Sequence, residues 1–147
     1  MVRSQRGTVL IDAVLAILIM AAAGVVFSAA FPSGLNTLRD SSEQSKAAAM
    51  AQKKVEQVRS LDYANITYTN LLAAGYIDST PTSSPYWFTS VDSVATDLNG
   101  ATGTLTITPQ SGAILKIVAA VQWRSERNVL RNVTVTTLVA DSSPWVH

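Results

Sequence analysis

The sequence predicts an α+β fold in which one long N-terminal helix packs on an antiparallel sheet of three or four strands. Three observations predict it. The run from Thr8 to Phe31 is apolar and its only charged residue is Asp12, residues 35–61 carry a helical apolar stripe, and apolar residues alternate in the segments after residue 100. The chain has 147 residues, a formal net charge of +1 and no cysteine. It is long enough for one small domain with a core, and a disulfide framework is excluded.

The apolar run is long enough to cross a lipid bilayer as a helix, because about 20 apolar residues in helical form span ~30 Å of hydrocarbon. Arg3 and Arg6 precede the run, and no lysine or arginine follows closely after Phe31. This asymmetry predicts a cytoplasmic N-terminus with the rest of the chain outside. An acid such as Asp12 costs about 2.5–3.5 kcal/mol inside a membrane span, so we expect it to have a function and a cationic partner.

Three interpretations of this segment are open. The first is an uncleaved signal anchor. The second is a secretory signal peptide, for which Ser28, Ala29 and Ala30 supply small residues near a cleavage site. The length of the apolar run and the presence of Asp12 weigh against a signal peptide. The third interpretation comes from a resemblance to a known family.

The segment from Gly7 to Ile17 resembles the cleavage and methylation motif of type IV prepilins and type II secretion pseudopilins. The resemblance implies that residues 1–7 are a leader, that a prepilin peptidase cuts between Gly7 and Thr8, and that it methylates the new amine of Thr8. Asp12 takes the acidic position of the mature chain. The sequence departs from the family at two positions, which usually carry Phe in place of Thr8 and Glu in place of Asp12.

The resemblance also implies a pilin-like fold and a set of partners. The expected partners are the prepilin peptidase, other pilin or pseudopilin subunits, an inner-membrane assembly platform and the lipid bilayer. The protein would start as a single-pass protein of the bacterial inner membrane with its folded part outside, and would then enter a pilus or pseudopilus filament. Asp12 would pair with the amine of a neighbouring subunit, since a buried carboxylate is tolerated when a cation pairs with it.

The family motif does not distinguish a major pilin, a minor pilin and a secretion pseudopilin. The alternative function is a secreted or membrane-tethered extracytoplasmic binding domain that does not polymerise. Asp12 separates the two hypotheses, because a passive tether has no use for an acid in its span.

Residues 8–31 are therefore the expected membrane and assembly helix, and residues 32–62 an amphipathic stalk helix. We expect Pro32 and Gly34 to interrupt the helix between them. The stalk has one apolar stripe, made of Ala47, Ala51, Val55, Val58 and Leu61. Its opposite face is expected to carry Lys46, Lys53, Lys54, Glu56, Gln57 and Arg59.

Residues 63–85 are rich in turn-forming residues and are expected to form a connecting loop, with a short helical turn at residues 71–74. Residues 86–147 are expected to form the β domain. The segments with strand character are 86–95, 102–108, 113–124 and 129–140, and the expected turns are Asn99-Gly100, 109–112 and 125–128. Residues 141–147 are expected to be a loose tail.

The sequence offers few candidates for chemistry, and we expect no catalytic residues, no cofactor and no metal site. The only histidine is His147 at the C-terminus. Asp92, Asp97, Asn99 and Gly100 weakly resemble a calcium loop, but a hairpin turn explains them better. Lys116, Arg124, Arg127 and Arg131 are expected to cluster at the last hairpin as a solvated face, so nucleic acid is not an expected partner. The trio Tyr86, Trp87 and Phe88 is either an exposed contact site or, as we prefer, part of the core.

Overall fold

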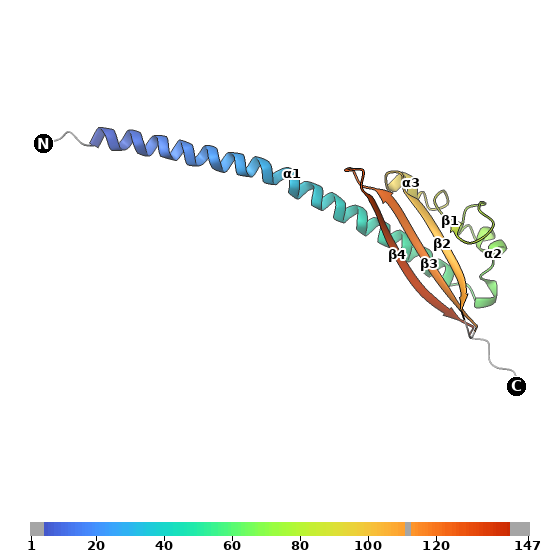
Figure 1. Ribbon diagram of the computed structural model, residues 1–147. Coiled ribbons are helices and arrows are strands. Elements are labelled where there is room, and N and C mark those ends of the chain that lie inside the picture. The colour runs from blue at the N-terminus through green and yellow to red at the C-terminus, as the bar shows by residue number, and fades with distance from the viewer. Residues whose placement is uncertain (1–4, 111–112, 142–147) are drawn as a thin grey trace. The chain divides into compact units, whose positions relative to one another are not determined.

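The structure is a computed structural model in which residues 5–110 and 113–141 are described, with the side chains of residues 10–28, 34–110 and 113–141. The chain divides into two compact units, residues 1–40 and residues 41–147. We call the second unit the head. The elements, in chain order, are α1 (Gln5–Arg59), the short 3-10 helix η1 (Tyr63–Asn65), α2 (Tyr68–Ala73), β1 (Tyr86–Trp87), α3 (Val94–Asp97), β2 (Thr102–Gln110), β3 (Ile114–Arg124) and β4 (Leu130–Ala140) (Figure 1).

Helix α1 contains both predicted helical segments, because it continues without a break through Pro32 and Gly34. The predicted interruption at these residues is therefore wrong. A proline inside a helix removes only one backbone N–H donor, and a helix can continue past it at that cost. Ala29, Ala30, Leu35 and Leu38 on either side favour a helix and offset part of the cost of Pro32 and Gly34.

The head contains a four-stranded antiparallel sheet in the order β1-β2-β3-β4. This confirms the predicted α+β class and the three long strands. The register pairs Ile107 of β2 with Ile117 of β3, and Val121 of β3 with Val133 of β4. Residues 117, 119, 121 and 123 of β3 are buried, whereas the residues between them are exposed or half-buried. The two-residue alternation seen in the sequence therefore does separate a core face from an outer face.

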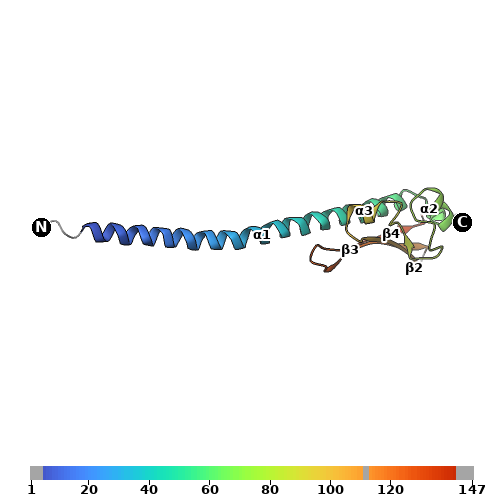
Figure 2. The same ribbon diagram turned by 90° about the horizontal axis from the view of Figure 1, so that it is seen from above.

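The helix layer of the head is the C-terminal part of α1, which lies along one face of the sheet (Figure 2). Its buried side chains are the predicted stripe of Ala47, Ala51, Val55 and Val58. They belong to one hydrophobic cluster with residues of β2 and β3, such as Leu105 and Ile117. The prediction that the stalk stripe packs on the sheet is confirmed.

Two predicted elements of the head differ from the structure. The expected strand over residues 86–95 is reduced to the two residues of β1, after which the chain turns into α3. Gly100 has a positive φ of 57°, as the turn prediction required, but the turn joins α3 to β2 and does not connect two strands. The prediction of a hairpin at Asn99-Gly100 is therefore wrong. Of the turn predicted at 109–112, Pro109 and Gln110 belong instead to β2, and residues 111 and 112 lie outside the described part.

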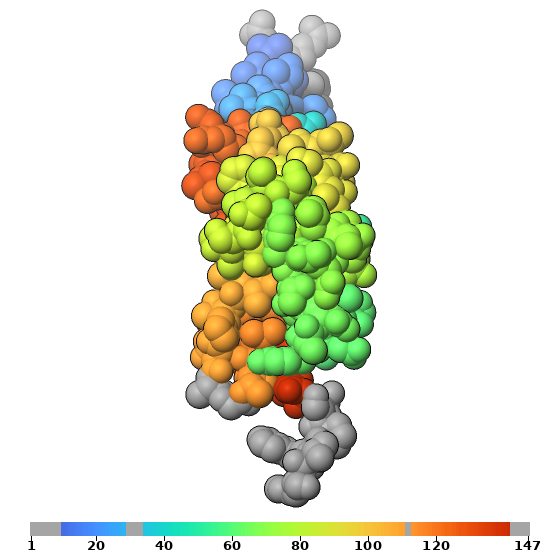
Figure 3. Space-filling model, turned by 90° about the vertical axis from the view of Figure 1, so that its right-hand side faces the viewer, coloured from blue at the N-terminus to red at the C-terminus, as the bar shows by residue number. Residues whose placement is uncertain are grey.

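The connecting segment contains the predicted helical turn as α2, which begins at Tyr68, three residues earlier than expected, and is preceded by Thr67 as its N-cap. The Thr67 side chain caps the helix by accepting a hydrogen bond from the backbone N–H of Asn70. On the face of the head shown in Figure 3, this segment (green) lies next to the residues that lead into β1 (yellow-green). The tail predicted at 141–147 lies outside the described residues except for Asp141.

Candidate functional site

The N-terminal part of α1 contains a candidate membrane span at Leu10–Ser28. It is the one helix in the described chain that is long and apolar enough to cross a bilayer, judged by length and composition. Its 19 residues correspond to a helix of ~28 Å. None of the span is buried within the chain itself, and its large side chains, such as Leu10, Ile17 and Met20, are more than half exposed. This surface needs an apolar surrounding that the rest of the described chain does not supply.

Asp12 lies near the beginning of the span, on the exposed surface of α1. Its described neighbours on the helix surface, three and four residues further on, are Leu15 and Ala16, which are both apolar and exposed. Among the side chains that the structure describes, none makes a hydrogen bond or ion pair with the Asp12 carboxylate. The structure therefore brings an acid and an apolar surface together, and the described side chains supply no counter-charge.

Gly7 and Thr8 lie in the first turns of α1, and their side chains are outside the described part. Thr8 and Asp12 are four residues apart in one helix, which is a rise of ~6 Å and about one turn. The backbone of Thr8 and the Asp12 side chain therefore lie on the same side of α1. The three residues taken from the family motif are thus close together along the helix.

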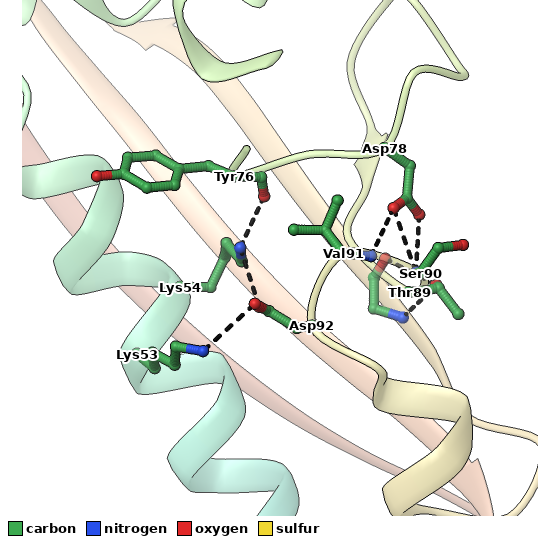
Figure 4. Close-up of polar contacts among 9 residues, drawn as sticks. Lys53, Lys54, Tyr76, Asp78, Thr89, Ser90, Val91 and Asp92 are labelled. Carbon is green, nitrogen blue, oxygen red and sulfur yellow. Dashed lines mark hydrogen bonds and ion pairs between the residues drawn. The ribbon is translucent and has the colours of Figure 1, made fainter. Parts of the chain in front are cut away.

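The head contains a second charged site in apolar surroundings, which the sequence interpretation missed. The Lys54 side chain is fully buried, with an exposed fraction of 0%. Its Nζ lies 2.9 Å from Oδ2 of Asp92 and donates a hydrogen bond of 2.7 Å to the carbonyl oxygen of Tyr76 (Figure 4). The ammonium also lies 5.1 Å from the ring centre of Phe88 and 5.7 Å from that of Tyr76. Lys54 therefore has ionic, hydrogen-bonding and cation–π partners within the head.

Burial lowers the pKa of Lys54 from its ordinary value of 10.5, and the hydrogen bond and charge of Asp92 oppose this shift. The opposing carboxylate is itself nearly buried, and its Oδ1 lies 3.4 Å from Nζ of the exposed Lys53. The cluster thus joins α1 to the loop that follows β1 through a pair of adjacent lysines and a single acid.

The placement of Lys54 corrects its assignment to the exposed face of the stalk. Positions 47, 51, 54 and 58 follow one another at steps of four, three and four, which keeps them on one side of a helix. Lys54 therefore lies within the stripe that faces the sheet. This spacing could have indicated that Lys54 faces the sheet. A lysine in an apolar stripe needs a charged partner, however, and Asp92 could not be identified as that partner because it is far away in the sequence.

A second acid fixes the same loop. The Asp78 carboxylate accepts hydrogen bonds from the backbone N–H groups of Ser90, at 3.1 and 3.2 Å, and of Val91, at 2.9 Å. The backbone N–H of Asp78 donates to the carbonyl oxygen of Trp87 at 2.6 Å. Asp78 therefore connects the end of the connecting segment to β1 and to the loop after it (Figure 4).

The other sequence candidates are not brought together. Asp92 is engaged by two lysines and Asp97 lies in α3, and the described residues contain no group of three or more His, Cys, Asp or Glu arranged to hold a metal ion. Lys116 pairs with Leu138, whereas Arg124 pairs with Leu130 at the other end of β3. The two cations are eight positions apart along the strand, which is ~26 Å, so the expected basic cluster does not include Lys116.

The chain was also compared with protein-family models, with curated proteins and with solved structures. None of these comparisons finds a significant match.

Proposed function

We propose that the chain is a structural subunit of a type IV pilus or of a type II secretion pseudopilus. In this proposal a prepilin peptidase cuts after Gly7, the new amine of Thr8 is methylated, and the subunit assembles through its N-terminal helix. Before assembly it is a single-pass protein of the bacterial inner membrane with the head outside. The proposal rests above all on Asp12, an acid in the otherwise apolar span Leu10–Ser28 that has no counter-charge among the described side chains.

The chemistry of the cleavage product explains why the acid is useful. Cleavage after Gly7 creates a positive amine one helical turn before Asp12. Within one subunit this amine lies on the same side of the helix as the carboxylate. In a bundle of helices that are displaced along their axes, the amine of one subunit can instead reach Asp12 of a neighbour. Such a pair offsets the cost of the buried acid and also fixes the axial register of the helices.

Two further features support the proposal. Small residues such as Ala21, Ala22, Ala23 and Gly24 lie on the exposed surface of the span, where they allow close helix packing. The head combines the second part of α1 with an antiparallel sheet, which is the arrangement that the family resemblance implies.

The deciding experiment is the mass of the N-terminus. The full chain is expressed in a bacterial host with and without a co-expressed prepilin peptidase, extracted from membranes and analysed by intact-mass spectrometry. We expect a product that starts at Thr8 and carries one methyl group, formed only when the peptidase is present. Gly7→Leu should remain uncleaved. A chain that keeps Met1 in both hosts, or one that starts after Ala30, contradicts the proposal and favours an anchor or a signal peptide.

The role of Asp12 has a separate test. Asp12→Ala should be cleaved normally but should enter sheared filaments much less than the wild type, because the carboxylate that recruits the neighbouring amine is missing. Asp12→Glu keeps the charge and should be incorporated. Normal incorporation of Asp12→Ala would remove the assigned role, and a head that never appears in filaments would favour the tethered binding domain.

A further inference from the structure

The surface of the head contains a pocket of about 480 Å³. Its lining comes from α2, from the segment that follows it, from β1 and from the loop after β1. These parts of the head lie on the face shown in Figure 3. None of its lining residues belongs to the buried cluster at Lys54.

Exposed apolar side chains gather at this pocket. In the described part of the head, six large apolar side chains are exposed, and three of them line it: Leu72 at 36%, Trp87 at 51% and Val91 at 41%. The other three, Val129, Leu130 and Leu138, lie on β4 or just before it. Exposed apolar side chains that gather around a hollow indicate a binding site more strongly than isolated ones do.

The exposure of Trp87 is imposed by its neighbours on both sides. Tyr86 faces inward and stacks on Tyr68, with ring centres 5.9 Å apart. Phe88 is fully buried and packs directly on Gly103, where a Cβ atom would lie 2.4 Å from the Phe88 ring. Because side chains alternate along a strand, two inward neighbours hold the indole outward. The aromatic trio is therefore split between the core and the surface, which corrects the expectation that all of it is core.

The wall of the pocket is held in place by hydrogen bonds. Asp78 binds the backbone of Trp87, Ser90 and Val91, as described above. The hydroxyl of Tyr68 donates a hydrogen bond of 2.8 Å to the carbonyl oxygen of Ser79. A pocket whose wall is already held in place by hydrogen bonds loses little conformational entropy when a ligand binds.

The lining identifies the chemistry of the ligand. No lysine or arginine lines the pocket, and its single acid, Asp78, accepts hydrogen bonds from backbone N–H groups. The remaining polar groups are the hydroxyls of Ser79, Thr80 and Ser90, which can both donate and accept hydrogen bonds. An exposed indole beside neutral hydroxyls suits a molecule with an apolar ring face and hydroxyl groups around its edge. We propose that this pocket binds a neutral saccharide, with the sugar ring against Trp87.

The test uses the full chain in a detergent without a sugar headgroup, since alkyl glycosides would compete for the site. The probe is an array of neutral mono-, di- and trisaccharides built from glucose, galactose, mannose and N-acetylglucosamine. A saccharide that binds on the array is then titrated in solution by calorimetry. We expect at least one member of the array to bind, and Trp87→Ala to weaken its binding at least tenfold.

Control variants distinguish specific binding at the pocket from nonspecific binding to exposed apolar side chains. Leu138→Ala removes a side chain that is 61% exposed on β4 and should leave binding unchanged. Thr80→Val removes one hydroxyl at nearly constant volume and should weaken binding several-fold. Near-ultraviolet circular dichroism checks that each variant is folded. An array on which no saccharide binds, binding that survives Trp87→Ala, or binding only of charged sugars or of apolar peptides overturns the proposal. Cleavage at Gly7 is measured independently, so failure here leaves the proposed function untouched.

Discussion

Asp12 and Lys54 are both charged groups in apolar surroundings on the same helix, yet the two units of the chain treat them differently. In the head, the Lys54 side chain is fully buried. Its ammonium forms an ion pair with Asp92, a hydrogen bond to the Tyr76 carbonyl oxygen and cation–π contacts with two aromatic rings. In the N-terminal unit, Asp12 is exposed among apolar side chains and has no counter-charge among the described ones. A buried charge that has a partner in its own chain stabilises a particular fold. A charge among apolar side chains that has no such partner indicates an interaction with another molecule.

The largest expected effect comes from removing the partner of Lys54. Asp92→Ala leaves a buried ammonium without its carboxylate, and breaking a buried pair in this way costs about 3–5 kcal/mol. We expect the free energy of unfolding of the head to fall by that amount, measured by denaturant titration of the full chain in detergent with near-ultraviolet circular dichroism. Replacing both partners, as in Lys54→Met with Asp92→Ala, should recover much of the loss because no charge is then buried.

A matched control uses the exposed ion pair on the same helix. Glu56 and Arg59 lie 3.1 Å apart and both side chains are more than half exposed. Glu56→Ala should change the stability by less than about 1 kcal/mol, the usual range for surface pairs. If Asp92→Ala is as mild as Glu56→Ala, the buried pair does not stabilise the head in the proposed way.

A smaller effect is expected from a methyl group at Gly103. The ideal Cβ would lie 2.4 Å from the buried Phe88 ring, so Gly103→Ala must displace the ring or the strand. Overpacking of this kind costs about 1–3 kcal/mol. The corresponding change in the N-terminal unit is Gly34→Ala, where a Cβ meets nothing within 4 Å. Thermal unfolding should show a lower midpoint for Gly103→Ala. Gly34→Ala should leave the midpoint unchanged or raise it slightly, because alanine favours a helix more than glycine does. Equal midpoints for the two variants would contradict the close packing at Phe88.

A still smaller effect concerns pH. Burial lowers the pKa of Lys54 below its ordinary value of 10.5, so in the alkaline range the unfolded chain binds this proton more tightly than the folded one. The free energy of unfolding should therefore rise with pH up to about 10.5 through this group. Lys54→Met lacks the proton, so the difference between wild type and variant isolates the contribution. The stability of the wild type relative to the variant should increase with pH, and a decrease would mean that the pairing with Asp92 outweighs burial.

The parts of the fold that follow from periodicity were predictable from the sequence. The stripe at Ala47, Ala51, Val55 and Val58 and the alternation along β3 each repeat several times, so single exceptions do not hide them. The N-terminal span was equally clear, because a long apolar run is a property of composition.

The features that depend on a contact between distant residues were not predictable. From the sequence alone, Lys54 is expected to be exposed. Its burial is explained only by the ion pair with Asp92, which lies 38 residues later in the chain. The burial of Phe88 and the exposure of Trp87 depend on Gly103. This glycine leaves room for the Phe88 ring in the core, and the alternation along the strand then directs Trp87 outward. The continuity of α1 through Pro32 was not predicted. The cost of a proline inside a helix favours a break, and the helical preference of flanking alanines and leucines favours continuation.

The smallest expected effect is the one that sharpens the comparison most. Asp12→Ala changes a residue that lies in the other compact unit. The free energy of unfolding of the head should therefore change by less than about 0.5 kcal/mol, as for substitutions away from buried features. The measurement is the same denaturant titration used for Asp92→Ala, carried out on unassembled protein in detergent. A loss of head stability comparable with that of Asp92→Ala would mean that Asp12 is satisfied within its own chain, and the reason for assigning it an external partner would disappear. An unchanged head together with impaired filament incorporation would locate the effect of Asp12 between subunits.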